Sequence, residues 1–371
     1  MSNPIHSTSA KSVLPMLAMR GLATGLCAGC VVGLLRLSHD RAAARVALWL
    51  EEWREVWWTV PIWFGVLVAL AVILRRIVRE EPLISGSGIP QTELALAGRL
   101  SFTWWRVLLA KFLGSWLALF GGLALGREGP SIQMGGAVGA GFHALWRPAA
   151  PHALTGSPYV VAGAVAGLAA AFGAPAAGVL FAFEEMKSRR DTSLIVAACA
   201  SAIGAHLMIR IVFGMGRILP FAGFEAPPLS SFWIVALEGA VFGVLGVGYN
   251  KTLLWLHDRE AGQTLIPDRW RALPPLLLAG CLALFAPLLI GGGESLIIFV
   301  GEHDVALKTL ILLLAFKYLF AQYSTVASIP GGLLMPILCL GALWGRLWAE
   351  LPVSALAAHG LASGSVQPYV L

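Results

Sequence analysis

Gly126-Arg127-Glu128-Gly129-Pro130 places two ionisable side chains between glycines, in the middle of otherwise apolar sequence of helix length. Between Lys111 and Arg147, these two are the only residues with a formal charge. Charges at membrane depth are costly, so such a pair, followed by a proline suited to the first turn of a helix, indicates a functional site. The alternative is a structural ion pair between Arg127 and Glu128. It fits less well, because adjacent residues on a helix do not face each other.

The composition is that of a protein that crosses a membrane many times. Of the 371 residues, 58% are hydrophobic and only 12% are charged, whereas globular proteins average about 25% charged residues. The basic excess behind the net charge of +6 lies near the ends of apolar segments, as at residues 75–79 and 187–190. This placement is typical of cytoplasmic anchors and not of a nucleic-acid surface, so no nucleic-acid partner is expected. We predict an integral, multi-pass membrane protein.

The first apolar stretch, residues 14–37, follows a polar N-terminus that has no evident cleavage site. It is therefore predicted to be a spanning helix and not a removed signal peptide. Residues 39–55 mix both charge signs with several tryptophans, and we expect a loop there at the membrane interface opposite the basic anchors. Cys27 and Cys30 have the spacing of a redox or zinc pair, but no second pair or nearby histidine accompanies them. Packing within the membrane is favoured, and neither a metal site nor a disulfide framework is predicted.

Apolar segments long enough to span a bilayer, about 20 residues each, alternate with shorter ones broken by glycine or proline. The long segments are 14–37, 57–78, 104–125, 193–214, 230–256, 272–290 and 305–327. The shorter ones are 87–98, 129–146, 158–172, 175–186 and 331–350. Interrupted helices at membrane depth need protein or a water-filled cavity to satisfy their backbone, and in transporters they mark the binding site. We predict an all-α polytopic fold with many tilted and broken helices.

A linker is predicted near residues 221–231, where two adjacent prolines interrupt the apolar pattern. It divides a single membrane domain, residues 1–371, into a first half at 14–215 and a second half at 228–371. No soluble regulatory domain is expected. Small residues spaced four apart, which let helix backbones approach closely, occur at Gly135, Gly139, Gly163 and Gly167.

Three segments share one design, in which glycine leads through a short loop to a proline that opens a helix. They are Gly86-Ser87-Gly88-Ile89-Pro90, Gly126-Arg127-Glu128-Gly129-Pro130 and Gly331-Gly332-Leu333-Leu334-Met335-Pro336. Each helix start exposes unpaired N–H groups and the positive end of the helix dipole. Several converging starts would therefore bind an anion without a full cationic side chain, and weakly enough to release it. Any one of the segments could be an ordinary capped helix, but the three together, one with a carboxylate inside it, favour an anion site.

These motifs resemble those of the CLC family of chloride channels and chloride/proton exchangers. The match comprises the three segments, Lys111, the run Ala-Ala-Ala-Phe-Gly-Ala-Pro ending at Pro175, Glu184-Glu185-Met186 and Ile290-Gly291-Gly292-Gly293. In order and spacing it covers about residues 80–350. The resemblance implies an inverted-repeat membrane fold and a homodimer in which each subunit has its own anion path.

The resemblance also implies roles for individual residues. Glu128 resembles the external gating glutamate, which mimics an anion when deprotonated and swings away when protonated. Glu185 resembles the internal proton-transfer glutamate, which many exchangers have and channels commonly lack. Ser87 is similar to the hydroxyl donor to the central anion, as suits chloride or nitrate. The backbone amides that the resemblance implies as anion ligands are those of Gly88, Gly129, Leu333 and Leu334.

Supporting roles are implied for three charged residues. Lys111 and Arg127 would add positive potential, and Glu93 would be buried near the proton route or the dimer face. Taken on the residues alone, Glu184 and Glu185 end an apolar helix beside basic residues, which is more typical of a solvated helix end. The resemblance favours a proton role for Glu185, whereas Glu184 keeps the solvated interpretation.

Some features depart from the family pattern. Leu334 stands where the family motif usually has phenylalanine, and Gln91 replaces the acid that commonly follows the first motif. The second half is shorter than the first, so we expect the chain to be C-terminally short relative to the family. The family's tyrosine anion ligand would lie beyond it, because Tyr369 is too near Pro336 to serve.

We predict a chloride/proton antiporter in a bacterial inner membrane, which exchanges chloride and similar anions for protons without a cofactor. Glu128 would be the gate and outer proton site, Ser87 an anion ligand and Glu185 the inner proton site. The alternatives are a passive chloride channel of the same fold, a truncated non-transporting remnant, and a membrane-embedded enzyme. The enzyme would use Glu128, Glu185 and His143 as acid–base groups, but no metal spacing, nucleophile motif or cofactor fingerprint supports it. A non-enzymatic protein is therefore expected.

Overall fold

The computed structural model describes residues 5–53, 56, 58–184, 191–219, 229 and 232–350, and its regular structure is helical. The α-helices are α1 (Ile5–Trp53), α2 (Thr59–Glu80), α3 (Ile89–Leu96), α4 (Trp104–Phe120), α5 (Glu128–Trp146), α6 (Pro158–Phe172), α7 (Pro175–Glu184), α8 (Thr192–Leu207), α9 (Phe232–Gly262), α10 (Leu273–Phe285), α11 (Glu294–Glu302), α12 (Leu307–Val326) and α13 (Leu334–Glu350). Short helical turns are η1 (Pro82–Ile84), η2 (Met208–Val212), η4 (Asp268–Trp270) and η5 (Pro287–Leu289). Extended pairing in this part of the chain is limited to two isolated bridges between loops. The predicted all-α fold is confirmed.

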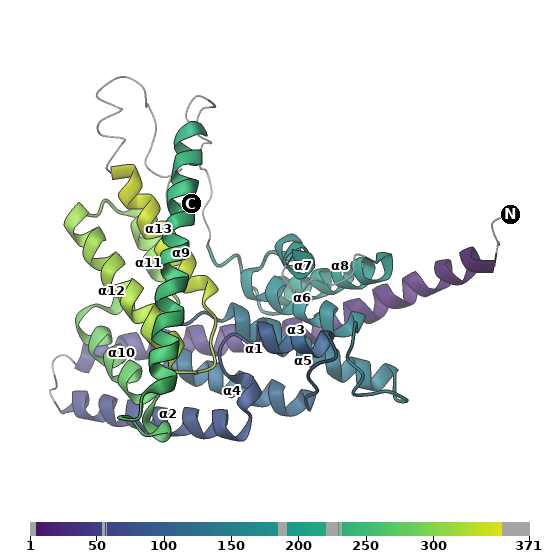
Figure 1. Ribbon diagram of the computed structural model, residues 1–371, viewed down its shortest axis with the longest axis horizontal. Coiled ribbons are helices and arrows are strands. Elements are labelled where there is room, and N and C mark those ends of the chain that lie inside the picture. Colours follow the sequence, from purple (N-terminus) through teal and green to yellow (C-terminus); the bar gives the residue numbers. More distant parts are fainter. Residues whose placement is uncertain are drawn as a thin grey trace.

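The helices form two groups that meet at the middle of the molecule (Figure 1). In the first group α1 contacts α5, α6 and α8, and in the second α12 contacts α9 and α13. Among the described residues, five helical segments are long and apolar enough to cross a membrane. They are Val13–Val46, Thr59–Glu80, Thr192–Val212, Phe232–Gly262 and Leu307–Val326. The predicted linker near 221–231 lies largely outside the described residues.

Four elements differ from the sequence-based expectation. Helices α4 and α10 have only 17 and 13 residues, so the predicted long spanning segments at 104–125 and 272–290 are too long, because a loop or a short helical turn follows each helix before the predicted end. Helix α1 continues to Trp53, so the loop predicted at residues 39–55 is wrong for most of its length. Residues 38–53 contain neither glycine nor proline, and nothing local therefore stops the helix. Helix α11 was not predicted, because its nine residues are too few to show a clear periodic pattern.

The small residues of α5 and α6 bring the two helix backbones into direct contact. A Cβ atom added at Gly163 would lie 2.1 Å from the carbonyl oxygen of Gly135, and one at Gly167 would lie 2.0 Å from that of Ser131. Contacts this short leave no room for any side chain, as expected of small residues spaced four apart. Helix α5 is consequently buried along most of its length, and its N-terminus is held deep inside the protein.

Two buried lysines show that the second half repeats the design of the first. Lys111 Nζ in α4 donates to the carbonyl oxygens of Ile84 and Gly86, which lie 27 and 25 residues earlier. Lys317 Nζ in α12 donates to those of Leu289 and Gly291, 28 and 26 residues earlier. Each lysine thereby holds the loop that precedes a short helix, α3 in one half and α11 in the other. The matching pairs reveal the internal repeat.

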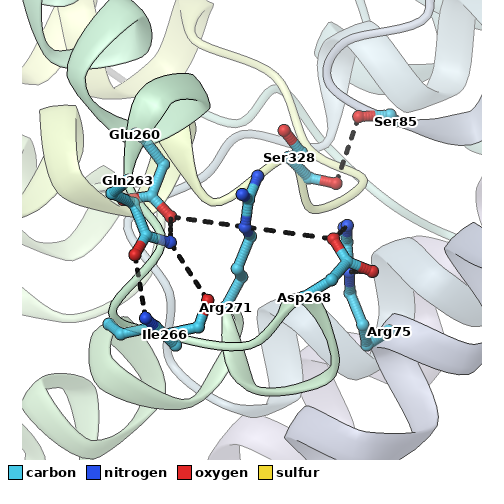
Figure 2. A network of polar contacts seen from close by, with 8 residues as sticks. All are labelled: Arg75, Ser85, Glu260, Gln263, Ile266, Asp268, Arg271 and Ser328. Carbon is cyan, nitrogen blue, oxygen red and sulfur yellow. Dashed lines mark hydrogen bonds and ion pairs between the residues drawn. The ribbon is translucent and has the colours of Figure 1, made fainter.

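A polar network at one edge of the protein joins the two halves (Figure 2). Arg75 of α2 binds both carboxylate oxygens of Asp268 in η4, with Nε donating to Oδ2 at 3.1 Å. Arg271 Nε lies 3.9 Å from Asp268 Oδ1 and 4.0 Å from Glu260 Oε1 at the end of α9. The hydrogen bond from Arg75 holds the pKa of Asp268 below its ordinary value.

Asp268→Asn is expected to lower the thermal stability of the protein slightly, and only where the carboxylate is charged. A carboxylate whose pKa is depressed by folding stabilises the folded state above its unfolded pKa, and this contribution is lost as pH falls through the folded pKa. Because the Asp268 side chain is 49% exposed, we expect a loss of about 1 kcal/mol or less. Thermal unfolding in detergent should show the loss at about pH 7 and a smaller loss near pH 3, below the unfolded pKa of about 4. An equal loss at both pH values would contradict this role.

Candidate functional site

The three glycine-led loops meet at the centre of the molecule, as predicted. Gly126 and Gly332 exchange two backbone hydrogen bonds, each with an N–O distance of 2.7 Å. Gly331 N donates to Gly86 O at 3.0 Å, and Gly86 N donates to Ile329 O at 3.2 Å. The loop before α13 is therefore bonded to the loops before both α3 and α5. A reciprocal, antiparallel pair of this kind is expected where two equivalent loops of an inverted repeat meet.

The helix starts that follow these loops lie against one another. A Cβ atom added at Gly129, near the start of α5, would be 2.8 Å from Ser87 Cβ, and one at Gly332 would be 3.0 Å from Gly129 N. Gly88 caps α3 with φ of +88°, a conformation that favours glycine. The Ser87 hydroxyl accepts a hydrogen bond from Ile89 N at 3.3 Å, so its own proton is available to another acceptor. Amide and hydroxyl donors from three helix starts are thus concentrated in one place.

The Glu128 side chain occupies this convergence and is completely buried. A Cβ atom added at Gly126 would lie 2.1 Å from Glu128 Oε2, so the carboxylate folds back over the glycine-led loop. Neither carboxylate oxygen has a hydrogen-bond partner of normal geometry in the described chain, although the backbone amides of Glu128 and Met335 are close enough to interact with it. A buried carboxylate with so few partners is costly to keep charged. Its position therefore indicates a functional role for Glu128 and not a structural one.

Arg127 points away from Glu128, and the structural ion pair between them is not present. Its Nη1 donates to Asp40 Oδ1 in α1 at 2.9 Å, and its Nη2 lies 3.4 Å from Glu294 Oε1 at the start of α11. The Arg127 side chain is 7% exposed. Arg127 therefore contacts α1 and α11, whereas Glu128 lies among the converging helix starts, as expected for neighbours on a helix, which do not face each other.

The family model described as voltage gated chloride channel matches residues 64–367. The chain belongs to the voltage-gated chloride channel family. It is an integral membrane protein with the CLC-type inverted-repeat fold, and both predictions are confirmed.

Named relatives in this family are transporters. Over 331 residues the chain is 35% identical to the H(+)/Cl(-) exchange transporter ClcA of Vibrio cholerae serotype O1, covering 86% of this chain and 70% of that protein. Over 362 residues it is 30% identical to the H(+)/Cl(-) exchange transporter ClcA of Klebsiella pneumoniae subsp. pneumoniae, and the match covers 95% of this chain and 75% of that protein. Its structure matches that of a slow cyanobacterial Cl-/H+ antiporter with a TM-score of 0.82 at 27% identity, covering 91% of this chain and 81% of that one.

Three other predicted site residues, Leu333, Leu334 and Lys111, lie at or beside the converging helix starts. Leu333 accepts the first hydrogen bond of α13, from Ile337 N at 3.0 Å, and Leu334 is 37% exposed at the start of that helix. Fully buried Lys111 holds the carbonyl oxygens of the loop that leads to Ser87, so it positions the first helix start. The role of Lys111 as a source of positive potential stays a prediction.

Of the two other residues predicted to serve the proton route, Glu93 lies apart from the converging helix starts, and Glu185 is not among the described residues. Glu93, expected to be buried, is partly exposed and lines a cavity of about 1260 Å³ together with Arg20, Arg99 and Arg147. Glu185 lies outside the described residues, and the exposed Glu184 is the last described residue of α7. The inner end of the predicted proton route therefore stays a prediction.

Three charged residues near the site were not singled out from the sequence. Asp40 and Glu294 approach Arg127 from α1 and α11, and Lys317 supports the loop before α11. A signal existed for Lys317, because it is an isolated charge within an apolar helix, like Lys111. Glu294 directly follows Gly291-Gly292-Gly293, so a fourth glycine-led helix start, that of α11, also carried a carboxylate.

Proposed function

We propose that this protein is a chloride/proton antiporter in which Glu128 is the gate. The observation that carries the proposal is the fully buried Glu128 carboxylate at the convergence of the helix starts. The similar proteins described above are named as chloride/proton exchange transporters or antiporters, which supports the same conclusion.

The exchange rests on competition between a carboxylate and a halide for the same donors. Deprotonated Glu128 occupies the convergence as an anion would, close to the amides of Glu128 and Met335. When Glu128 takes up a proton it loses its charge and its attraction to these donors, and a chloride ion replaces it. The Gly129 amide and the Ser87 hydroxyl would then face the ion. Chloride departure lets Glu128 return and release its proton, so the two ions move in opposite directions.

The inner half of the proton route is assigned to Glu185. A carboxylate near the inner end of the protein would deliver or receive protons that Glu128 exchanges outside. We further propose a homodimer in a bacterial inner membrane, with lipid around it, that acts without a cofactor and catalyses no chemical reaction. Chloride is the expected anion, because Ser87 offers a hydroxyl donor.

Reconstitution of the purified protein into sealed lipid vesicles tests the proposal. An outward chloride gradient imposed on vesicles with no pH difference should drive protons inward, against the gradient that they create, and a proton carrier should collapse it. Chloride flux without such proton movement would identify the passive channel instead. No flux of either ion, from vesicles that hold folded protein, would overturn transport altogether.

A further inference from the structure

We propose that Glu294 is a positioning residue for the gate: together with Asp40 it engages Arg127, withholds that guanidinium from Glu128, and thereby sets the pH at which transport is half-activated. This inference rests on the proposed role of Glu128 and extends it to a residue on a different helix start.

The contacts of Arg127 carry the inference. Its two terminal nitrogens face two carboxylates, Asp40 at 2.9 Å and Glu294 at 3.4 Å. Those carboxylates come from α1 and α11, which are distant in sequence, so the arrangement depends on how the helices pack. With Arg127 engaged on both sides, its positive charge is partly compensated, so it acts on Glu128 only through space and not as a directly bonded counter-ion.

Glu294 is more accessible to solvent than the gate residue Glu128. Its side chain is 27% exposed, whereas Glu128 is fully buried. Glu294 lines a cavity of about 320 Å³ together with His39, Arg127 and the glycines at 291–293. As the first residue of α11, its carboxylate is also favoured by the positive end of that helix dipole.

The charges in direct contact with Arg127 explain why Glu294 matters. Arg127 contributes one positive charge, and Asp40 and Glu294 contribute two negative charges, so this trio carries a net negative charge. The Glu294 and Glu128 carboxylates are close enough to interact electrostatically, and a like charge opposes a second ionised carboxylate. The other titratable or charged groups that face this cluster are Arg36 and His39 on α1, Lys317 on α12 and Cys339 on α13.

Glu294→Gln is the direct test, with chloride efflux from vesicles measured as a function of external pH. The variant leaves the trio neutral, so a charged Glu128 is opposed less and its protonation needs more acid. We expect the half-activation pH to fall by about one unit, on the scale of a single nearby charge. Glu302→Gln is the matched control, because Glu302 ends the same helix at an exposed position, and it should leave the half-activation pH unchanged.

Asp40→Asn provides an independent second variant, which removes the other carboxylate from Arg127 and should shift the half-activation pH in the same direction. The shift caused by Glu294→Gln should persist when His39 is replaced by Asn, because the effect is exerted on Glu128 and not on the imidazole. It should disappear in a Glu128→Gln background, where no gate carboxylate remains to titrate.

An unchanged or more alkaline half-activation pH in both Glu294→Gln and Asp40→Asn would overturn the inference. So would a Glu294→Gln shift that survives in the Glu128→Gln background or vanishes without His39. These outcomes differ from failure of the proposed function, which would appear in the unmodified protein as chloride flux without coupled proton movement.

Discussion

Glu128→Gln is expected to carry chloride while moving almost no protons. The amide imitates the shape of the protonated carboxyl group, but it cannot take up or release a proton. It also carries no charge with which to compete for the helix-start donors, so the convergence is left open to chloride. We expect proton movement driven by a chloride gradient to fall by about 100-fold or more. External pH and chloride efflux, recorded in the same vesicles, measure both parts of this prediction.

Glu238→Gln is the matched control for this experiment. Glu238 is also a buried carboxylate, 7% exposed, but it lies in α9 and belongs to none of the three converging loops. Its removal should leave coupling intact. Proton movement that persists after Glu128→Gln, or that is lost equally after Glu238→Gln, would show that Glu128 is not the coupling carboxylate.

Gly163→Leu is expected to prevent α5 from packing against α6 and so to abolish the folded protein. The first atom of any side chain at this position would lie 2.1 Å from the Gly135 carbonyl oxygen and 2.9 Å from the carbon that bears it. Both are backbone atoms of a buried helix, so neither can move without displacing the start of α5, which carries Glu128. We expect a cost of about 3 kcal/mol or more, seen as loss of the monodisperse peak in detergent chromatography.

Gly243→Leu tests whether this effect comes from packing and not from the change of helix propensity. Gly243 lies inside α9, and an added Cβ there would meet no described atom within 4 Å. Leucine is a better helix former than glycine by roughly 0.5–1 kcal/mol, so this variant should stay folded. If both variants yield the same amount of folded protein, the close contact between α5 and α6 does not stabilise the protein as described.

Local features of the fold were predictable because their causes are local. Membrane-spanning segments follow from about 20 apolar residues in a row, and the helix starts follow from glycine and proline at the loops that precede α3, α5 and α13. The long α1 was missed because the mixed charges of residues 39–55 were interpreted as a loop, although nothing in 38–53 interrupts a helix. The short α11 was missed because nine residues carry too little periodicity.

By itself, the sequence determined that this chain crosses a membrane, that its helices are interrupted by glycine-led turns, and that Glu128 stands in one of them. These properties depend on transfer free energy and backbone preference, which act within a few residues. Only the tertiary structure decided which groups meet. The reciprocal bonds of Gly126 and Gly332 join residues about 200 positions apart, and Arg127 turns from its neighbour Glu128 to Asp40 and Glu294. Such partners are chosen by the packing of whole helices, which no local pattern of residues records.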